Sequence, residues 1–265
     1  MDTTERELLE EALRKTMTTS APGRELDVAL ADLGWPEMLT QEPDTAVPLV
    51  FRLLGETGAH APVLNDVLLH AAGRPVGGTV ALPYAGGSWV EWGRDETSSG
   101  SPLDSGLPLG RVGPGEAVAL AAGRRALGWW LLGTGHAMLA LARRHVLDRH
   151  QFGRPLASFQ ALRHRLAETC VALEGAEAVL RASMDDTDDT GALLAKAAAG
   201  RAALTAARHC QQALGGIGFT AEHDLHRHVK RALVLDGLLG SARQLTREAG
   251  ALLLREGRAP RLVDL

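Results

Sequence analysis

The stretch SFQALRHRLAETCVALEGAEAVLRASM, residues 158–184, has the apolar periodicity of a long amphipathic helix. Apolar side chains recur three or four residues apart along it, which places them on one face of a helix. The members of this stripe are Phe159, Leu162, Leu166, Cys170, Leu173, Val179 and Leu180. Ser158 is the predicted N-cap, because a serine oxygen can accept a free backbone N–H of the first turn.

Three more segments, residues 116–148, 190–214 and about 238–255, have similar length and helical character. The segment 190–214 is rich in small residues, which allows neighbouring helices to approach closely, and Gly215-Gly216 is a typical helix end. Long helices joined by short links predict an antiparallel four-helix bundle. We place it in a C-terminal domain of residues 116–265.

The N-terminal region, residues 1–73, is also predicted to be helical. It contains four shorter segments with helical periodicity, at residues 5–17, 25–33, 45–56 and 62–72. The second is expected to end at Gly34 and Pro36, and Asp44 is expected to cap the third. Gly58 and Gly73 are the predicted ends of the last two.

The middle region, residues 74–115, differs in composition, with many glycines and several prolines. Residues 78–84 and 88–92 alternate as short strands do, and Gly86-Gly87 between them suits a hairpin turn. We expect a small β insert or loop, too short to form a domain of its own. The whole chain is therefore predicted to be mainly α.

Composition excludes several classes of protein. The 265 residues carry a net charge of −4 and 45% hydrophobic residues, so neither a disordered chain nor a nucleic-acid binder is expected. The two cysteines, Cys170 and Cys210, exclude a disulfide framework and fit a reducing compartment. The N-terminus lacks the apolar core of a secretion signal, and the longest apolar run, 126–142, includes His136 and three glycines. We expect a cytoplasmic protein.

Two motifs flank the central helices. The first is Arg149-His150-Gln151-Phe152-Gly153, followed by Phe159-Gln160, and the second is QALGGIGFTAEHDLH at residues 212–226. Together they resemble the acyl-CoA dehydrogenase family, whose C-terminal bundle carries R-x-Q-F-G, F-Q and Q-x-x-G-G-x-G-[FY] in this order. The form GGIGFTAEHDLH is most similar to the actinobacterial branch. The resemblance covers residues 116–248 and fails over the middle region, where the family has a much larger β-domain.

The resemblance implies that the chain helps to bind FAD across a subunit interface. Arg149 would pair with the pyrophosphate, Phe152 would cover an apolar part of the cofactor, and Gln212 with the backbone of Gly215 and Gly216 would approach the ADP half. Gln151 belongs to the same cofactor-binding set. The alternative readings are structural: Arg149 as a surface arginine at a helix end, and the two glycines as a helix stop.

The family's catalytic base is missing from both places where the resemblance puts it. The Y-E-G-T-like turn aligns with Leu239-Gly240-Ser241-Ala242, so Gly240 occupies the usual base position, and the alternative position on the first bundle helix aligns with Gly123. We therefore predict no catalytic residue in this chain. If the alignment with the family motif is out of register, Asp236 or Glu116 would be the catalytic base instead.

Two polar clusters contain possible metal ligands, but neither is predicted to be a metal site. Glu222, His223, Asp224, His226 and His228 match no zinc spacing and are interpreted as a polar turn between helices. The aspartates at 185–189 lack the glycine and closing glutamate of a calcium loop, so a solvated loop is expected.

Three functions are consistent with the sequence. The first is a non-catalytic subunit of a heteromeric, FAD-dependent acyl-CoA dehydrogenase acting on a bulky CoA thioester of sterol or lipid catabolism. Its partner would be a catalytic acyl-CoA dehydrogenase subunit, or else a second copy of the chain. The second is an acyl-CoA dehydrogenase fold diverted to non-redox biosynthetic chemistry, with Glu222 or His223 as acid–base groups. The third is a structural partner that binds no flavin.

Overall fold

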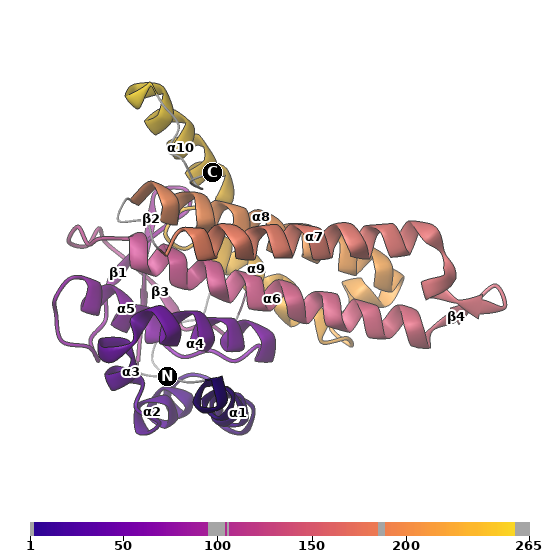
Figure 1. The fold of residues 1–265 in the computed structure, drawn as a ribbon, viewed down its shortest axis with the longest axis horizontal. Helices are drawn as coiled ribbons and strands as arrows, with labels where there is room; N and C mark the ends of the chain where they lie inside the picture. Colours follow the sequence, from indigo (N-terminus) through magenta and orange to yellow (C-terminus); the bar gives the residue numbers. More distant parts are fainter. Residues whose placement is uncertain (1–2, 95–103, 105, 185–188, 258–265) are drawn as a thin grey trace.

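Three long helices lie side by side along the molecule (Figure 1). They are α6 (Ala121–Asp148), α7 (Gln160–Ala182) and α8 (Asp189–Leu214). The computed structural model describes residues 3–94, 104, 106–184 and 189–257. Among the described residues, no helix is both long enough and apolar enough to span a membrane.

The fourth helix of the bundle is α9 (Leu225–Gly237), which packs on α6 and α8. The prediction of a helix at 238–255 in this place was wrong. That segment forms α10 (Ala242–Glu256), which contacts α8 and projects away from the bundle (Figure 1). A helix cannot begin at residue 238 because Leu239 and Gly240 both have left-handed backbone, with φ of 54° and 101°.

Close backbone packing fixes α6 against its neighbours. The structure has an N-terminal helix, α4 (Pro43–Thr57), that crosses α6 where Gly55 faces Gly133. A Cβ atom at Gly133 would collide with the carbonyl oxygen of Arg52, and one at Gly55 would collide with the carbonyl oxygen of Trp130. On the side of α6 that faces α7, a Cβ atom at Gly128 would lie 2.5 Å from the side-chain atom Cδ2 of Leu180. These glycines therefore serve helix packing rather than flexibility.

The N-terminal helices are α1 (Thr3–Thr19), α2 (Arg24–Asp32), α3 (Trp35–Gln41), α4 and α5 (Val63–Ala71). Helix α3 was not predicted, because Pro36 was interpreted as a stop. A proline is tolerated in the first turn of a helix, and Pro36 lies there. Asp44 also lies in the first turn of α4 and does not cap it, since Glu42 holds the N-cap position without a side-chain bond.

The middle region forms a three-stranded antiparallel sheet of β1 (Ala81–Tyr84), β2 (Ser88–Trp92) and β3 (Leu109–Val112). The predicted hairpin is confirmed: Gly86 and Gly87 both have positive φ in the turn between β1 and β2. Strand β3 was not predicted. The Ser-rich segment 97–101 lies outside the described residues.

A chain of aromatic rings joins the sheet to the helices. Trp92 of β2 stacks on Trp130 of α6 with ring centroids 5.4 Å apart, and Phe51 of α4 meets Trp130 edge-on at 5.7 Å. Trp35 continues the chain against Phe51. All four side chains are buried, so the N-terminal helices, the sheet and the bundle share one apolar core.

The link between α6 and α7 contains a small hairpin and a short helical turn. The hairpin consists of β4 (His150–Gln151) and β5 (Arg154–Pro155), and the 3-10 turn η1 (Leu156–Ser158) follows it. Ser158 is therefore not the N-cap of α7, a position held by Phe159. At the other end of the chain, Ser241 does cap α10, in a reciprocal capping box with Gln244.

The crossing of α4 and α6 gives a direct test of the fold. We expect Gly133→Ala to lower the free energy of unfolding by about 1–3 kcal/mol, because its Cβ has no space against the α4 backbone. Gly175→Ala on α7 is the matched control. No atom lies within 4 Å of a Cβ there, so alanine should stabilise the helix by roughly 0.5–1 kcal/mol. Urea denaturation measures the free energy of unfolding of both variants. Equal changes in the two variants would contradict the close contact between α4 and α6.

Candidate functional site

The two sequence motifs lie at the same end of the bundle. Helix α7 follows α6 in the chain and runs antiparallel to it, and α8 then runs in the same direction as α6. The C-terminal ends of α6 and α8 therefore lie at the same end of the bundle. The rings of His145 in α6 and His223 after α8 confirm this contact, with centroids 6.2 Å apart. The β4–β5 hairpin extends from this end (Figure 1).

The hairpin holds an aromatic side chain out from the surface. Phe152 and Gly153 form the two-residue turn and both have positive φ, of 56° and 76°. Phe152 is 90% exposed and touches only the edge of the Phe159 ring among aromatic groups of the described residues. The guanidinium of Arg154 lies 4.1 Å from the centre of that Phe159 ring. An exposed phenylalanine on a strained turn is typical of a contact surface.

Arg149 lies at the junction of α6 and the hairpin. It is the C-cap residue of α6, and its carbonyl oxygen accepts a hydrogen bond from the Leu156 N–H at 2.8 Å. Its side chain is exposed, and so are Gln151 in β4 and Gln212 near the end of α8. These three polar groups are free to contact a molecule outside the chain.

The glycines after α8 have different structural requirements. Gly215 needs its positive φ of 63°, and Gly218 is packed so tightly that a Cβ would lie 2.7 Å from the Gln211 carbonyl oxygen. Gly216 has neither requirement, because its φ is not left-handed and nothing lies within 4 Å of a Cβ position. The structure thus leaves the main chain of Gly216 open to approach, as a phosphate- or nucleotide-binding turn would.

Both candidate base positions are glycines that are packed against leucine side chains. A Cβ at Gly123 would lie 2.7 Å from Leu68 Cδ2 and 2.8 Å from Leu239 Cδ1. At Gly240, the φ of 101° disfavours any side chain, and a Cβ would lie 2.8 Å from Leu245 Cδ2. The loop between α9 and α10, residues 238–241, contains two leucines, Gly240 and a serine.

A buried cation holds this loop in place. Lys196 of α8 is fully buried and donates hydrogen bonds to the carbonyl oxygens of Asp236 and Gly240, at 2.9 and 2.6 Å. Arg124 donates to the Leu239 carbonyl oxygen at 3.3 Å, and the Leu239 N–H donates to Pro83 at the edge of the sheet. Burial lowers the pKa of Lys196 to about 7, although the charge of Asp236 opposes this shift.

Asp236 and Glu116, the alternative base residues, are engaged elsewhere. Asp236 is buried, and its Oδ1 accepts the N–H of Ala242 at the start of α10, at 3.0 Å. Glu116 precedes α6 on the surface and lies 3.8 Å from Arg74. Lys196 was missed by the sequence analysis, although a single lysine among the small residues of AKAAAG was a visible signal.

The polar cluster at 222–228 is partly helical, so its interpretation as a turn was wrong for its second half. Helix α9 begins at Leu225, whose N–H donates to His223 Nδ1 at 3.1 Å. His228 is largely buried against Gly58, and burial lowers its pKa to about 4. The cluster therefore serves mainly to begin α9.

Only one group of described residues, His136, Glu174 and Glu177, brings possible metal ligands within 4.8 Å of one another. The carboxylate of Glu177 already accepts hydrogen bonds from Arg52 at 3.2 Å and Arg181 at 2.6 Å. Two guanidinium groups therefore neutralise the side chain that a cation would need. None of the three residues was predicted from the sequence to bind a metal.

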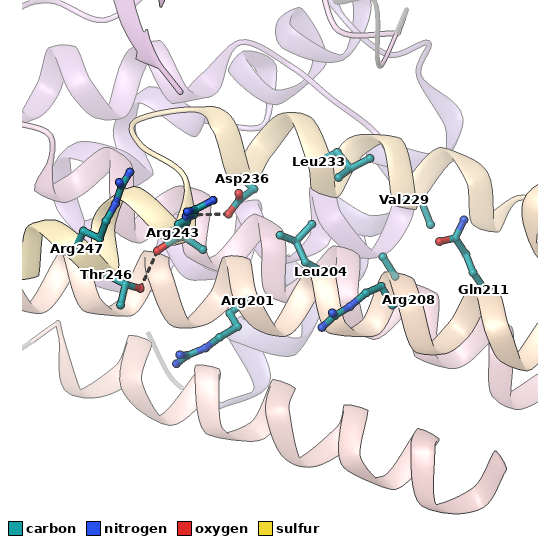
Figure 2. A pocket seen from close by; sticks show the side chains of 12 residues that line it. Arg201, Leu204, Arg208, Gln211, Val229, Leu233, Asp236, Arg243, Thr246 and Arg247 are labelled. Atoms are coloured by element: carbon teal, nitrogen blue, oxygen red, sulfur yellow. Dashed lines mark hydrogen bonds between the residues drawn. The ribbon is translucent and has the colours of Figure 1, made fainter. Parts of the chain in front are cut away.

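A groove of about 660 Å³ lies between α8, α9 and α10 (Figure 2). Its apolar lining includes Leu204, Val229 and Leu233, and Asp236 and Ala242 connect it to the loop at 238–241. Four arginines also line it. They are Arg201 and Arg208 from α8, and Arg243 and Arg247 from α10.

The buried lysine predicts a specific pH dependence of stability. The pKa of Lys196 is about 7 in the folded chain and close to 10.4 in the unfolded chain, so the unfolded chain binds more protons between these values. The free energy of unfolding should therefore gain a rising contribution from pH 7 to pH 10. Urea denaturation across this range should show that Lys196→Met removes this contribution.

Lys230→Met is the matched control, because Lys230 is exposed on α9. It should keep the pH slope of the unmodified chain. An equal slope in all three proteins would contradict the assigned environment of Lys196.

The comparisons with known proteins agree with this geometry. A family model described as "Acyl-CoA dehydrogenase, C-terminal domain" matches residues 117–250, half of the chain. Acyl-CoA dehydrogenase IpdE2 of Mycobacterium tuberculosis is 40% identical over 116 residues, which cover 44% of this chain and 36% of IpdE2. Acyl-CoA dehydrogenase FadE34 of the same organism is 35% identical over 205 residues, 66% of this chain and 28% of FadE34. The chain thus matches about a third or less of the length of these relatives.

Solved structures share the fold at lower identity. A structure described as the Tcur3481-Tcur3483 steroid ACAD G363A variant has a TM-score of 0.75 and 20% identity, covering 96% of this chain and 99% of that one. The ChsE4-ChsE5 complex of Mycobacterium tuberculosis has a TM-score of 0.70 and 18% identity, covering 98% and 99%. With the family model and this fold in agreement, the chain belongs to the acyl-CoA dehydrogenase family.

Proposed function

We propose that this chain is the non-catalytic subunit of a heteromeric, FAD-dependent acyl-CoA dehydrogenase. The observation that carries the proposal is that Gly123 and Gly240, which occupy the two expected base positions, have no side chain and are packed against Leu68, Leu239 and Leu245. Removal of an α-proton needs a base placed within hydrogen-bond reach of that proton. A catalytic partner subunit would supply the carboxylate.

The proposed substrate is a bulky CoA thioester of sterol or lipid catabolism. Two proteins of the same fold are described as a steroid ACAD made of Tcur3481 and Tcur3483, and as a complex of ChsE4 and ChsE5. These descriptions apply to those proteins, and they motivate both the substrate class and the two-chain assembly proposed for this one.

The residues at the bundle end fit one half of an FAD site. The donors suit a dinucleotide: the Arg149 guanidinium for the pyrophosphate, the Gln151 and Gln212 amides, and the open main chain of Gly215 and Gly216. Phe152 adds an exposed aromatic surface. FAD supplies the hydride acceptor when bound, and the partner would cover the flavin ring, because the described part of residues 74–115 forms only a small three-stranded sheet.

The proposal assigns a role to each region of the chain. Residues 116–265 would form the cofactor- and partner-binding domain, residues 1–73 would support α6, and residues 74–115 would connect them as a reduced β insert. The non-redox alternative has less support. His223 already accepts the Leu225 N–H, which occupies one of its ring nitrogens.

The lone chain should be catalytically inactive. With FAD and a series of acyl-CoA substrates, we expect no steady-state turnover above background, since loss of a positioned base lowers the rate roughly 10²–10⁴-fold. Co-expression with an acyl-CoA dehydrogenase chain encoded beside it should give turnover. Gly240→Glu should not rescue the lone chain, because the φ of 101° at this position disfavours any side chain. Activity of the lone chain that disappears in Asp236→Asn or Glu116→Gln would refute the proposal.

Flavin retention by the complex tests the cofactor site. We expect Arg149→Ala to weaken FAD binding by about 1.5–3 kcal/mol, the usual worth of a hydrogen bond to a charged group. The measurement is flavin absorbance after gel filtration of the complex. Arg163→Ala, an exposed position on α7, should have no effect. A colourless complex with full assembly would instead favour the flavin-free structural role.

A further inference from the structure

The groove between α8, α9 and α10 combines an apolar lining with exposed positive charges (Figure 2). Its apolar residues are Leu204 and Ala207 of α8 and Val229 and Leu233 of α9. Leu233 is 43% exposed, so part of this apolar surface is open to solvent. We call the feature the arginine groove, after the four exposed arginines of its lining, Arg201, Arg208, Arg243 and Arg247.

The four arginines have no acidic partner within the described part of the chain. Among these residues, their only side-chain hydrogen bond joins Arg208 to Thr205 Oγ1, at 3.3 Å. Asp236 is the one acidic residue of the lining. Its Oδ1 accepts the Ala242 N–H at 3.0 Å, and its charge acts on the buried Lys196. The groove therefore presents several uncompensated positive charges beside an apolar surface.

Positive charge is concentrated in this part of the chain. Residues 190–257 contain nine Lys and Arg and five Asp and Glu, although the whole chain has 28 and 32. A two-fold contact with a second copy would place the arginine groove opposite itself. Like charges that face each other in an interface are strongly unfavourable. The occupant of the groove must therefore be acidic and different from this surface.

The spacing of the arginines favours a helical occupant. Arg201 and Arg208 lie seven residues apart on α8, which is about 10 Å along a helix, and Arg243 and Arg247 lie four residues apart on α10, about 6 Å. Acidic residues four and seven positions apart on a second helix repeat these distances. An extended strand is a poorer occupant, because helices α8, α9 and α10 use their backbone groups internally and offer no free edge for pairing.

We infer that the arginine groove binds an acidic amphipathic helix of the catalytic partner subunit. Apolar side chains of that helix, three or four residues apart, would pack on Leu204, Val229 and Leu233. Asp and Glu side chains beside this stripe would pair with the guanidinium groups, which bind carboxylates in a bidentate manner. The inference rests on the proposed function in taking an acyl-CoA dehydrogenase chain as the partner.

Site-specific crosslinking identifies the occupant. Leu233 is replaced by the photo-crosslinking residue p-benzoylphenylalanine in the full-length chain, which is co-purified with the acyl-CoA dehydrogenase chain encoded beside it. We expect irradiation to join it to a partner peptide with a helical apolar stripe and flanking acidic residues. The same replacement at Val171, which is 73% exposed on α7, should not capture that peptide. A crosslink to a second copy or to a peptide without acidic residues, or none from Leu233 in an assembled complex, would overturn the inference.

Charge reversal measures the contribution of the arginines. Arg208→Glu/Arg243→Glu should weaken association of the two chains roughly 100-fold in analytical ultracentrifugation, because attraction becomes like-charge repulsion. Arg163→Glu/Arg165→Glu makes the same charge change on the exposed face of α7 and should leave association unchanged. All four side chains are exposed, so folding should be retained, and circular dichroism verifies it. Association of the unmodified chains should also weaken as salt is raised.

A charge exchange separates paired contacts from general electrostatic attraction. Arginines in place of the acidic residues of the crosslinked partner peptide should restore association with Arg208→Glu/Arg243→Glu, and no gain in affinity would refute the pairing. Unchanged association of Arg208→Glu/Arg243→Glu in a complex that still turns over would refute the inference and leave the proposed function standing. Two chains that never associate would overturn both.

Discussion

The close approach of α4 and α6 at Gly55 and Gly133 is the constraint on which the rest of the structure depends. Because neither position has space for a Cβ atom, the two backbones are in contact, and this contact fixes the position of α6 relative to α4. In this position of α6, Trp130 packs against Phe51 of α4 and Trp92 of β2. These ring contacts join the small sheet to the helices. The sheet can therefore be short and still be anchored.

The same packing determines the chemistry available at the α9–α10 loop. Leu68 and Leu239 fill the space at Gly123, and the loop is held by Lys196, Arg124 and the edge of β1. Leucine side chains, Lys196, Arg124 and Asp236 thus surround the loop at 238–241. This arrangement holds the loop in one conformation, and the proposed function assigns proton transfer to a partner subunit.

Much of the fold could be predicted from the sequence. Apolar periodicity marks the long helices, Gly86-Gly87 marks the turn between β1 and β2, and Gly215-Gly216 marks the end of α8. Helix α9 was missed because its first turns are rich in His and Arg, so its buried stripe becomes visible only near Ala232. The start of α10 had a signal that was overlooked, the capping box of Ser241 and Gln244. The role of Lys196 depends on contacts between α8 and the loop at 238–241, which no local sequence pattern contains.

Exchange of the α-proton of a bound acyl-CoA in deuterated water tests the central claim most directly, because it reports the base without requiring flavin turnover. NMR would follow deuterium incorporation with the lone chain and with the two-chain complex. The account predicts no exchange above the solvent rate with the lone chain and clear exchange with the complex. Exchange catalysed by the lone chain would show that it contains a working base, and would contradict the assignment of that role to a partner.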